Sequence, residues 1–294
     1  MDLAEKLQSV VIEVDTRITR EDRAFCEKNQ AAYEEALNNY IEFRFFWETM
    51  EETQKELQKD VAARYRHDYL RSKDGPQITL SSITSHINSI HVDYIKAICG
   101  YFCSEYKVTI REKEIETALI PEQPEVYGRK DFEKWDEYCR QMEEMRITYQ
   151  DVVDRIMLQL DGRLLTEQAF FELREKCRNA AYINDKPRFE RRKSVLRFDS
   201  GFCHMRGWPF DGWEIYDGGK DLIRGMAHFE TGTFTELPAG VGELISFYEI
   251  ERSVFDFPDC NKLQQIRLFK NGRADVRFAT ESDAAQFVST YLAA

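Results

Sequence analysis

Gln264-Gln265-Ile266-Arg267-Leu268-Phe269, Lys270-Asn271-Gly272-Arg273 and Ala274-Asp275-Val276-Arg277-Phe278 follow one another near the end of the chain. The first and third runs alternate polar and apolar residues, which is typical of half-buried β-strands. Asn-Gly between two such runs is the strongest short-range sign of a hairpin, because a type I′ turn needs positive φ at both central residues. The stretch therefore predicts an antiparallel hairpin with Asn271 and Gly272 in its turn.

An amphipathic helix is predicted directly after this hairpin. Thr280 is a suitable N-cap, and Asp283 three residues later completes the pattern of a capping box. One apolar helix face then follows, formed by Ala284, Phe287, Val288 and Tyr291. Because a hairpin and one helix are not stable alone, residues 264–292 must close over apolar surface formed earlier in the chain.

Length and composition indicate a globular protein of one large or two ordinary domains. The chain has 294 residues, of which 43% are hydrophobic and 32% charged, enough for a sizeable core. No apolar run reaches the roughly 18 residues of a membrane span, and the acidic N-terminus lacks the pattern of a secretion signal. We therefore expect a cytoplasmic protein with no membrane partner and with its seven cysteines reduced.

The net charge of −12 is unevenly distributed. Residues 1–150 carry 21 lysines and arginines against 30 aspartates and glutamates, whereas residues 151–294 carry 20 against 23. Acidic surface repels phosphate backbones and attracts basic surfaces, including those with which other proteins hold nucleic acid. The acidic half is therefore expected to favour basic proteins as partners.

The first half of the chain is predicted to be helical. A short helix is expected at residues 3–12, and Thr19 with Asp22 has the capping-box pattern at the start of a span without Pro or Gly that reaches about residue 69. This span is one long helix or an antiparallel pair. Its aromatic cluster is too large for a single apolar stripe, so more than one helix face should be covered; the cluster is Phe43, Phe45, Phe46 and Trp47.

The rest of the chain is predicted to mix helices and strands. Helices are expected at residues 85–106, 130–160, 166–181, 220–229 and 240–251. Strands are expected at residues 108–110, 195–198 and 213–216, and a turn at residues 72–76. Residues 120–125, with two prolines and no apolar periodicity, are the best internal boundary. The predicted fold is α+β. A helical domain, residues 1–124, precedes an α+β domain, residues 125–294, whose small antiparallel sheet is closed by the terminal hairpin and helix.

Two groups of cysteines and histidines contain residue types that can bind zinc or form a nucleophile–base pair. One group is Cys99 and Cys103 with His86 or His91. The other is Cys203, His204, His228 and Cys260. Both groups fit buried positions better than a metal site, because the C-x₂-C spacing of structural zinc is absent. Phosphate-binding glycine loops and hydrolase motifs are absent as well, so we predict no metal, no cofactor, no catalytic residue and no enzymatic activity.

Two charged surfaces are the candidate binding sites. The candidate partner-binding acids are Glu48, Glu51, Glu52, Glu56, Asp60, Asp131, Glu133, Asp136, Glu137, Glu143 and Glu144. The candidate nucleic-acid contacts come from the only dense basic run and are Arg188, Arg191, Arg192 and Lys193. The alternative is that the acids form ordinary solvated helix faces and that the basic run is a solvated loop.

The run from Gln265 to Phe278, followed by a short terminal helix, resembles an uncharacterised family carried by phages and integrative conjugative elements of bacteria. In that family a Phe-Lys-Asn-Gly hairpin closes the domain, and some members adjoin DNA-methyltransferase domains. A looser resemblance extends over residues 151–294. This chain lacks the S-adenosylmethionine-binding and catalytic motifs of a methyltransferase. The resemblance therefore implies a mobile-element protein that acts on host defence or on DNA maintenance, without methyl transfer.

Three functions remain in view. The leading one is a non-enzymatic mobile-element protein that inhibits a host nucleic-acid-handling defence complex, such as a CRISPR effector, through its acidic surfaces. The alternative is a DNA-binding accessory protein for DNA modification or element maintenance that uses the basic run. The third is an enzyme built on Cys203, His204 or His228.

Overall fold

The computed structural model describes residues 17–70, 78–125, 132–207, 212–246 and 250–293. The chain forms two compact units. The helical unit comprises the residues up to Cys103 together with Thr109–Leu165, and the α+β unit comprises Ser104–Val108 and Thr166–Ala294. The predicted α+β class is confirmed, since the first half is helical and the second half contains small antiparallel sheets.

The two units divide at Leu165–Thr166, whereas the sequence placed the boundary at residues 124–125. The helices between residues 132 and 159 belong to the helical unit, because their side chains and backbone form contacts with its first helix. Arg44 Nη1 lies 2.6 Å from Glu143 Oε2, and the Tyr149 N–H donates to Gln30 Oε1 at 3.0 Å. The proline-containing segment 120–125 is therefore a connection within one unit.

The described residues of the helical unit form four long or medium helices, one short helix and a 3₁₀ turn. These are α2 (Arg20–Leu57), η1 (Ala63–Tyr65), α3 (Leu80–Tyr106), α4 (Glu112–Leu119), α5 (Phe132–Glu144) and α6 (Tyr149–Gln159). The capping box predicted at the start of α2 is confirmed, because Thr19 and Asp22 exchange side-chain-to-backbone hydrogen bonds of 2.8 and 3.1 Å. The predicted helix at residues 3–12 and turn at residues 72–76 lie outside the described residues.

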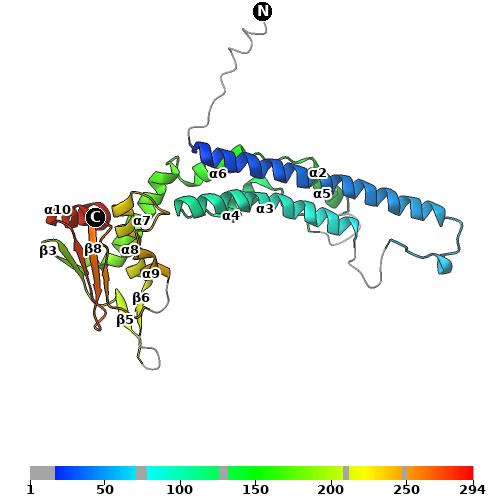
Figure 1. The fold of residues 1–294 in the computed structure, drawn as a ribbon. Helices are drawn as coiled ribbons and strands as arrows, with labels where there is room; N and C mark the ends of the chain where they lie inside the picture. Colours follow the sequence, from blue (N-terminus) through cyan, green and yellow to red (C-terminus); the bar gives the residue numbers. More distant parts are fainter. Residues whose placement is uncertain (1–16, 71–77, 126–131, 208–211, 247–249, 294) are drawn as a thin grey trace, which may run out of the picture. The chain divides into compact units, whose positions relative to one another are not determined.

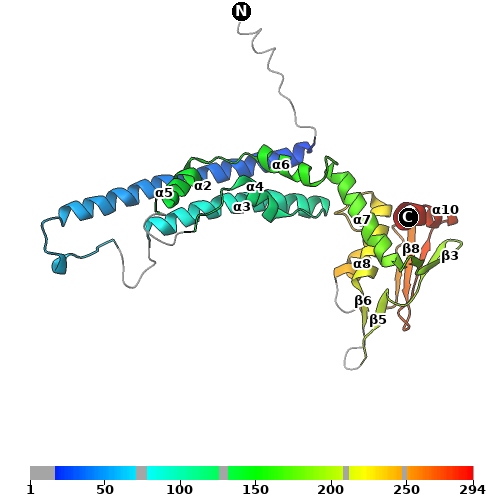
Figure 2. The same cartoon turned by 180° about the vertical axis from the view of Figure 1, so that it is seen from behind.

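Helices α2 and α3 lie side by side and antiparallel (Figures 1 and 2). Three ring pairs define their register, with centroids 3.9 to 4.2 Å apart: Phe25 with Tyr101, Tyr33 with Tyr94, and Tyr40 with His86. Aromatic pairs add to the free energy gained by burying their surface. The long span without Pro or Gly is thus a single helix as far as Leu57, which packs against a second helix.

A buried chain of hydrogen bonds joins α2, α3 and α5. The Nε2 of His91 donates to the Met142 carbonyl at 2.8 Å, so the neutral ring accepts at Nδ1 from the Tyr33 hydroxyl, 2.9 Å away. The Tyr33 oxygen in turn accepts from the Ile147 N–H at 3.2 Å. His91 is fully buried, so it is a structural residue of the core and is not available to a ligand.

The predicted helix at 130–160 is two helices, α5 and α6. Thr148 caps α6 with a capping box, in which the Asp151 N–H donates to the Thr148 hydroxyl at 3.2 Å and the Thr148 N–H donates back to Asp151 at 2.8 Å. The predicted strand at residues 108–110 does not form, and that segment instead leads into α4. The error at 130–160 comes from reading apolar spacing without the cap at Thr148 that interrupts it.

The α+β unit begins with a helix and ends with the predicted hairpin and helix. Its helices are α7 (Leu165–Ala181), α8 (Asp217–Thr231), α9 (Val241–Ser246) and α10 (Glu281–Phe287), which continues as a π-helical turn, η3 (Val288–Leu292). Its strands are β1 (Tyr182–Ile183), β2 (Lys186–Pro187), β3 (Phe189–Arg192), β4 (Val195–Phe198), β5 (Cys203–Met205), β6 (Trp213–Ile215), β7 (Val254–Asp256), β8 (Leu263–Leu268) and β9 (Ala274–Phe278).

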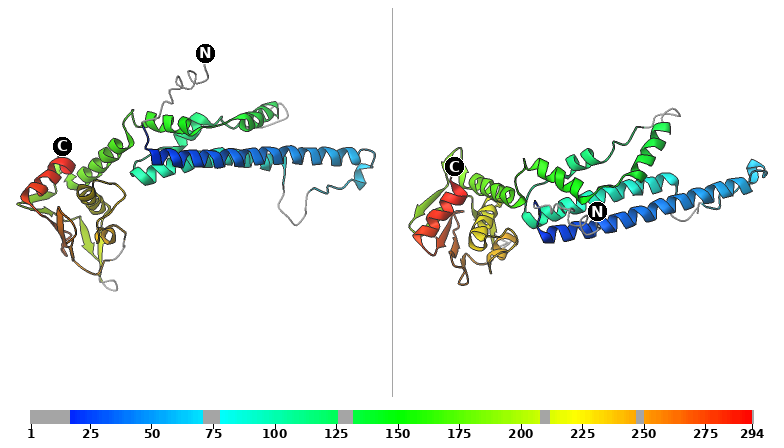
Figure 3. Two further views of the ribbon diagram at one scale, coloured as in Figure 1. Left: turned by 45° about the horizontal axis from the view of Figure 1, so that its top comes forward. Right: turned by 90° about the horizontal axis from the view of Figure 1, so that it is seen from above.

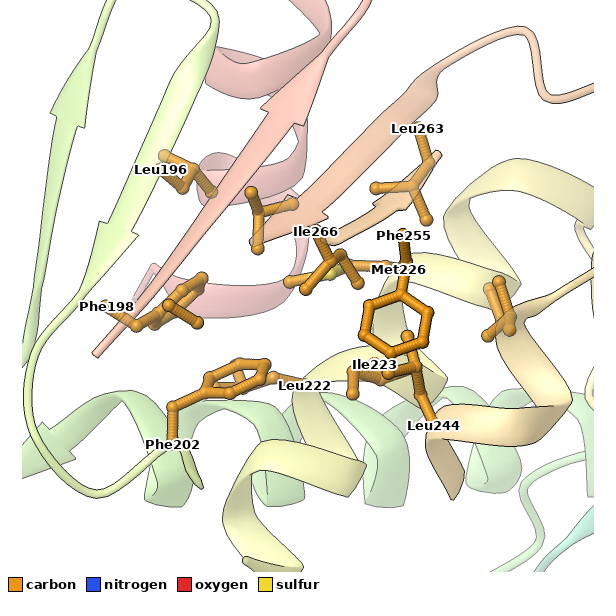
Figure 4. Packing of buried hydrophobic residues seen from close by; sticks show 14 of the residues in the cluster. Leu196, Phe198, Phe202, Leu222, Ile223, Met226, Leu244, Phe255, Leu263 and Ile266 are labelled. Atoms are coloured by element: carbon orange, nitrogen blue, oxygen red, sulfur yellow. The ribbon is translucent and has the colours of Figure 1, made fainter. Parts of the chain in front are cut away.

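Five of these strands form one antiparallel sheet in the order β3-β4-β9-β8-β7. One row across the sheet is fully or almost fully buried and comprises Leu196, Val276, Ile266 and Phe255. Figure 4 shows residues of this row facing Leu222, Ile223 and Met226 of α8. The terminal hairpin, β8 and β9, thus lies in the middle of the sheet and closes the core, as its sequence predicted.

The turn of this hairpin differs from the predicted type I′ turn. Within the described residues Gly272 has positive φ, 83°, whereas Asn271 does not. The Gly272 N–H donates to the Phe269 carbonyl and the Phe269 N–H to the Arg273 carbonyl, both at 2.9 Å. This is the pattern of a three-residue loop that ends in a left-handed glycine. The Gly272 carbonyl accepts N–H groups from Gly201, Phe202 and Cys203, so the turn is fastened to the preceding loop.

Candidate functional site

The last turns of α2 extend beyond the helix that packs on them. Because Tyr40 contacts His86 and the helices are antiparallel, the first residue of α3, Leu80, lies roughly opposite residue 46 of α2. Figures 1 and 3 show α2 continuing past this point. Residues 48–57 of α2 therefore have no α3 side chain opposite them.

Two phenylalanines are exposed where α3 begins. Phe45 is 57% exposed and Phe46 is 60% exposed, whereas Trp47 beside them is 6% exposed. The prediction that the aromatic cluster covers more than one helix face is therefore wrong for Phe45 and Phe46. Large apolar side chains that gather on a surface mark interaction sites more often than isolated ones do.

Three carboxylates share the helix face of these phenylalanines. Spacing of three and four residues places Glu42, Glu52 and Glu56 on this face, and all three are exposed. Glu56 pairs with Lys59 at 3.2 Å, whereas no ion pair within the described residues joins Glu42 or Glu52. We call the surface formed by Glu42, Phe45, Phe46, Glu52 and Glu56 the α2 patch.

Sequence reasoning missed part of the α2 patch. Glu42 was not among the predicted acids, although its spacing to Phe45 and Phe46 was a signal that could have found it. No pattern in the sequence could predict that the Phe45 and Phe46 rings are exposed, because their exposure depends on where α3 begins relative to α2.

The chain after α2 folds back onto the helix end. Gln58 Nε2 donates to the His67 carbonyl at 2.6 Å, and the His67 N–H donates to Gln58 Oε1 at 3.0 Å. Leu57 and Tyr69 are 79% and 80% exposed. They border an apolar hollow of about 390 Å³, lined by Thr49, Met50, Thr53, Gln54, Leu57, Gln58, Tyr69 and Leu70. Further apolar surface is therefore exposed close to the α2 patch.

The predicted acids do not form one acidic face. Glu143 lies against Arg44, and burial raises the pKa of its carboxyl above the ordinary value although Arg44 opposes the shift. Glu51 is mostly buried and accepts a hydrogen bond of 3.1 Å from Trp47 Nε1. Glu143 is therefore removed from the predicted binding surface, and Glu51 supports Trp47.

The other predicted acids lie on two helices or follow α2. The exposed ones are Glu52, Glu56, Asp60, Glu133, Asp136, Glu137 and Glu144, and Glu48 is half-buried. Glu137 accepts hydrogen bonds from Gln141 and Arg140, which lower the pKa of its carboxyl. Asp131 lies outside the described residues. Of this set, only Glu52 and Glu56 share the face of the exposed phenylalanines.

The predicted basic run is divided between structural and exposed positions. Arg188 donates to Asp199 at 3.0 Å and also to the Ser200 carbonyl, which ties β3 to the loop after β4. Arg192 pairs with Glu190 at 2.9 Å. Arg191 and Lys193 are exposed, and Lys193 occupies the β3–β4 turn with φ of 56°. The four residues therefore do not act as one basic patch.

The cysteines and histidines of the α+β unit have separate surroundings. The Cys203 thiol donates a hydrogen bond to the Arg273 carbonyl. Burial raises the pKa of this thiol to about 11, so the thiol is protonated at neutral pH. His204 stacks on Tyr216 and faces Glu214 at 3.4 Å. His228 Nδ1 forms a hydrogen bond of 2.7 Å with the Tyr291 hydroxyl. Cys260 is buried in the core cluster. None of these contacts forms a nucleophile–base pair.

Of the two cysteines in α3, Cys99 is buried and Cys103 is half-buried. Burial raises the pKa of Cys99 to about 12, and a thiol must lose its proton to bind zinc. Among the described residues, no group of three or more His, Cys, Asp or Glu side chains is arranged to hold a metal ion.

No family model, no curated protein and no solved structure matches this chain. None of the helices in the described ranges combines the length and the apolar character needed to cross a membrane.

Proposed function

We propose that this chain is a non-enzymatic binding protein that captures a basic partner protein through the α2 patch. The observation that carries the proposal is the exposure of Phe45 and Phe46 on one helix face with Glu42 and Glu52, which have no ion-pair partner among the described residues. Aromatic side chains supply much of the energy of protein interfaces. Carboxylates at the rim speed association with a basic surface and reject acidic ones.

The proposed partner is a host protein that handles nucleic acid. Such proteins hold phosphate backbones with clustered lysines and arginines, and an acidic patch with an aromatic centre competes for that surface. The net charge of −9 over residues 1–150 strengthens the attraction. The resemblance to a mobile-element family makes a defence complex such as a CRISPR effector the proposed target, and its inhibition the proposed effect.

Affinity capture with matched variants tests this function. Wild-type protein, Phe45→Ser/Phe46→Ser and Glu42→Lys/Glu52→Lys are compared on one bacterial lysate. The control is Glu27→Lys/Glu35→Lys, which makes the same charge change at exposed positions of α2 outside the patch. We expect the wild type and the control to capture the same basic protein, and both patch variants to lose it. Equal capture by all four proteins would refute the proposal.

A further inference from the structure

The outer face of the five-stranded sheet carries two polar rows. Cross-strand register aligns Arg192, Val195, Arg277, Gln265 and Asp256 in one row. It aligns Glu190, Arg197, Asp275, Arg267 and Val254 in the other. Side chains alternate between the two faces of a strand, so both rows point away from the core formed with α8. Arg267 and Arg277 are exposed.

Cations outnumber carboxylate partners on this face. Asp275 is shared by Arg197 at 3.3 Å and Arg273 at 3.4 Å, and Glu190 pairs with Arg192. No carboxylate within the described residues pairs with Arg267 or Arg277. The charges of these two guanidinium groups on neighbouring strands are therefore not neutralised by a described carboxylate, although Arg267 also lies over the Phe269 ring, 5.3 Å from its centroid.

A groove of about 770 Å³ lies at the end of this face. Its charged lining consists of three cations, Arg192, Lys193 and Arg277, and one carboxylate, Asp256, which accepts a hydrogen bond of 2.6 Å from Gln265. Its apolar lining consists of Val195, Phe257, Pro258, Phe278 and Ala279. The groove thus combines positive charge with apolar surface, although the whole chain is acidic.

We propose that the outer sheet face binds single-stranded nucleic acid. Strands are about 4.8 Å apart, so Arg192 and Arg277, two strands apart in one row, are separated by about 10 Å at their Cα atoms. Cations spaced in this way can contact different phosphates of one extended chain. Phe257 and Phe278 are buried, so unpaired bases can contact the accessible apolar lining, which is Val195, Pro258 and Ala279. The paired bases of a duplex are covered.

This inference is independent of the proposed function. It concerns a different unit, different residues and an anionic ligand, so either can fail alone. Because the Debye length is about 10 Å at 0.1 M salt, the local positive charge of the groove decides binding at close range despite the net charge of the chain.

Fluorescence anisotropy of a labelled single strand of about 20 nucleotides tests the inference. The full-length wild type is compared with Arg267→Gln/Arg277→Gln. The control, Lys176→Gln/Arg178→Gln, removes the same charge from exposed positions of α7. Each phosphate contact contributes about 0.7 to the slope of log K against log salt. We therefore expect the slope to fall by about 1.4 in the sheet variant and to stay unchanged in the control.

Four results would overturn the inference: no wild-type binding at low salt, an equal loss in both variants, tighter binding of the matching duplex, or equal binding of polyglutamate. The last would show that the face binds acidic peptide. Thermal unfolding of each variant shows whether the substitutions leave the fold intact, which is expected because neither Arg267 nor Arg277 has a carboxylate partner among the described residues.

Discussion

Gly272 holds the terminal hairpin against the loop at residues 200–203. Its φ is 83°, and a Cβ added there would lie 2.9 Å from the Cys203 carbonyl oxygen. We predict that Gly272→Ala lowers the free energy of unfolding by at least about 1–2 kcal/mol, because it combines left-handed strain with a backbone clash. Chemical denaturation measures this change. Gly207→Ala is the control, since a Cβ there meets nothing within 4 Å; an equal effect of the two substitutions would contradict the account.

His91 makes the stability of the helical unit dependent on pH. Burial lowers the pKa of its ring below 6.5, although the hydrogen bond to Met142 opposes the shift. The unfolded chain therefore binds a proton near pH 6.5 that the folded chain does not bind. We predict that the free energy of unfolding falls as the pH drops below about 6.5, with a slope from this residue of at most about 1.4 kcal/mol per pH unit. A ring that titrates at or above pH 6.5 by NMR would be inconsistent with this prediction.

At the scale of single elements, the cap of α6 separates two helices that the apolar pattern alone would join. Thr148→Ala removes the hydroxyl that accepts the Asp151 N–H. We predict a loss of about 1 kcal/mol in the free energy of unfolding, measured by denaturation. Thr117→Ala is the control, because the Thr117 hydroxyl only bonds back to the Lys113 carbonyl within α4. A change no larger than that of the control would show that the cap is dispensable.

Local signals predicted the elements well where a few neighbouring residues decide them. The capping boxes at Thr19 and Thr280 are present, and the two strands of the hairpin formed as expected. The predicted type of the hairpin turn did not form, because the Gly272 carbonyl accepts hydrogen bonds from residues far away in the sequence. The exposure of Phe45 and Phe46 was also beyond local reasoning, since it follows from the start of α3 at Leu80.

At the scale of the whole molecule, the division into two units predicts separate responses to damage. The core cluster that includes the sheet is formed by residues between Cys177 and Leu292. We predict that Gly272→Ala speeds amide hydrogen exchange in β4, β8 and β9 and leaves exchange in α2 and α3 unchanged. Faster exchange throughout the chain would mean that the two units unfold together.

The account depends on the α2 patch being the surface that a basic partner covers. Photo-crosslinking from position 46, with position 158 as the control, tests this most directly, because Phe46 and Leu158 are 60% and 69% exposed on the same unit. The account predicts a crosslink to one basic protein from position 46 and none from position 158. Crosslinking from position 158 alone, or equally from both positions, would contradict it.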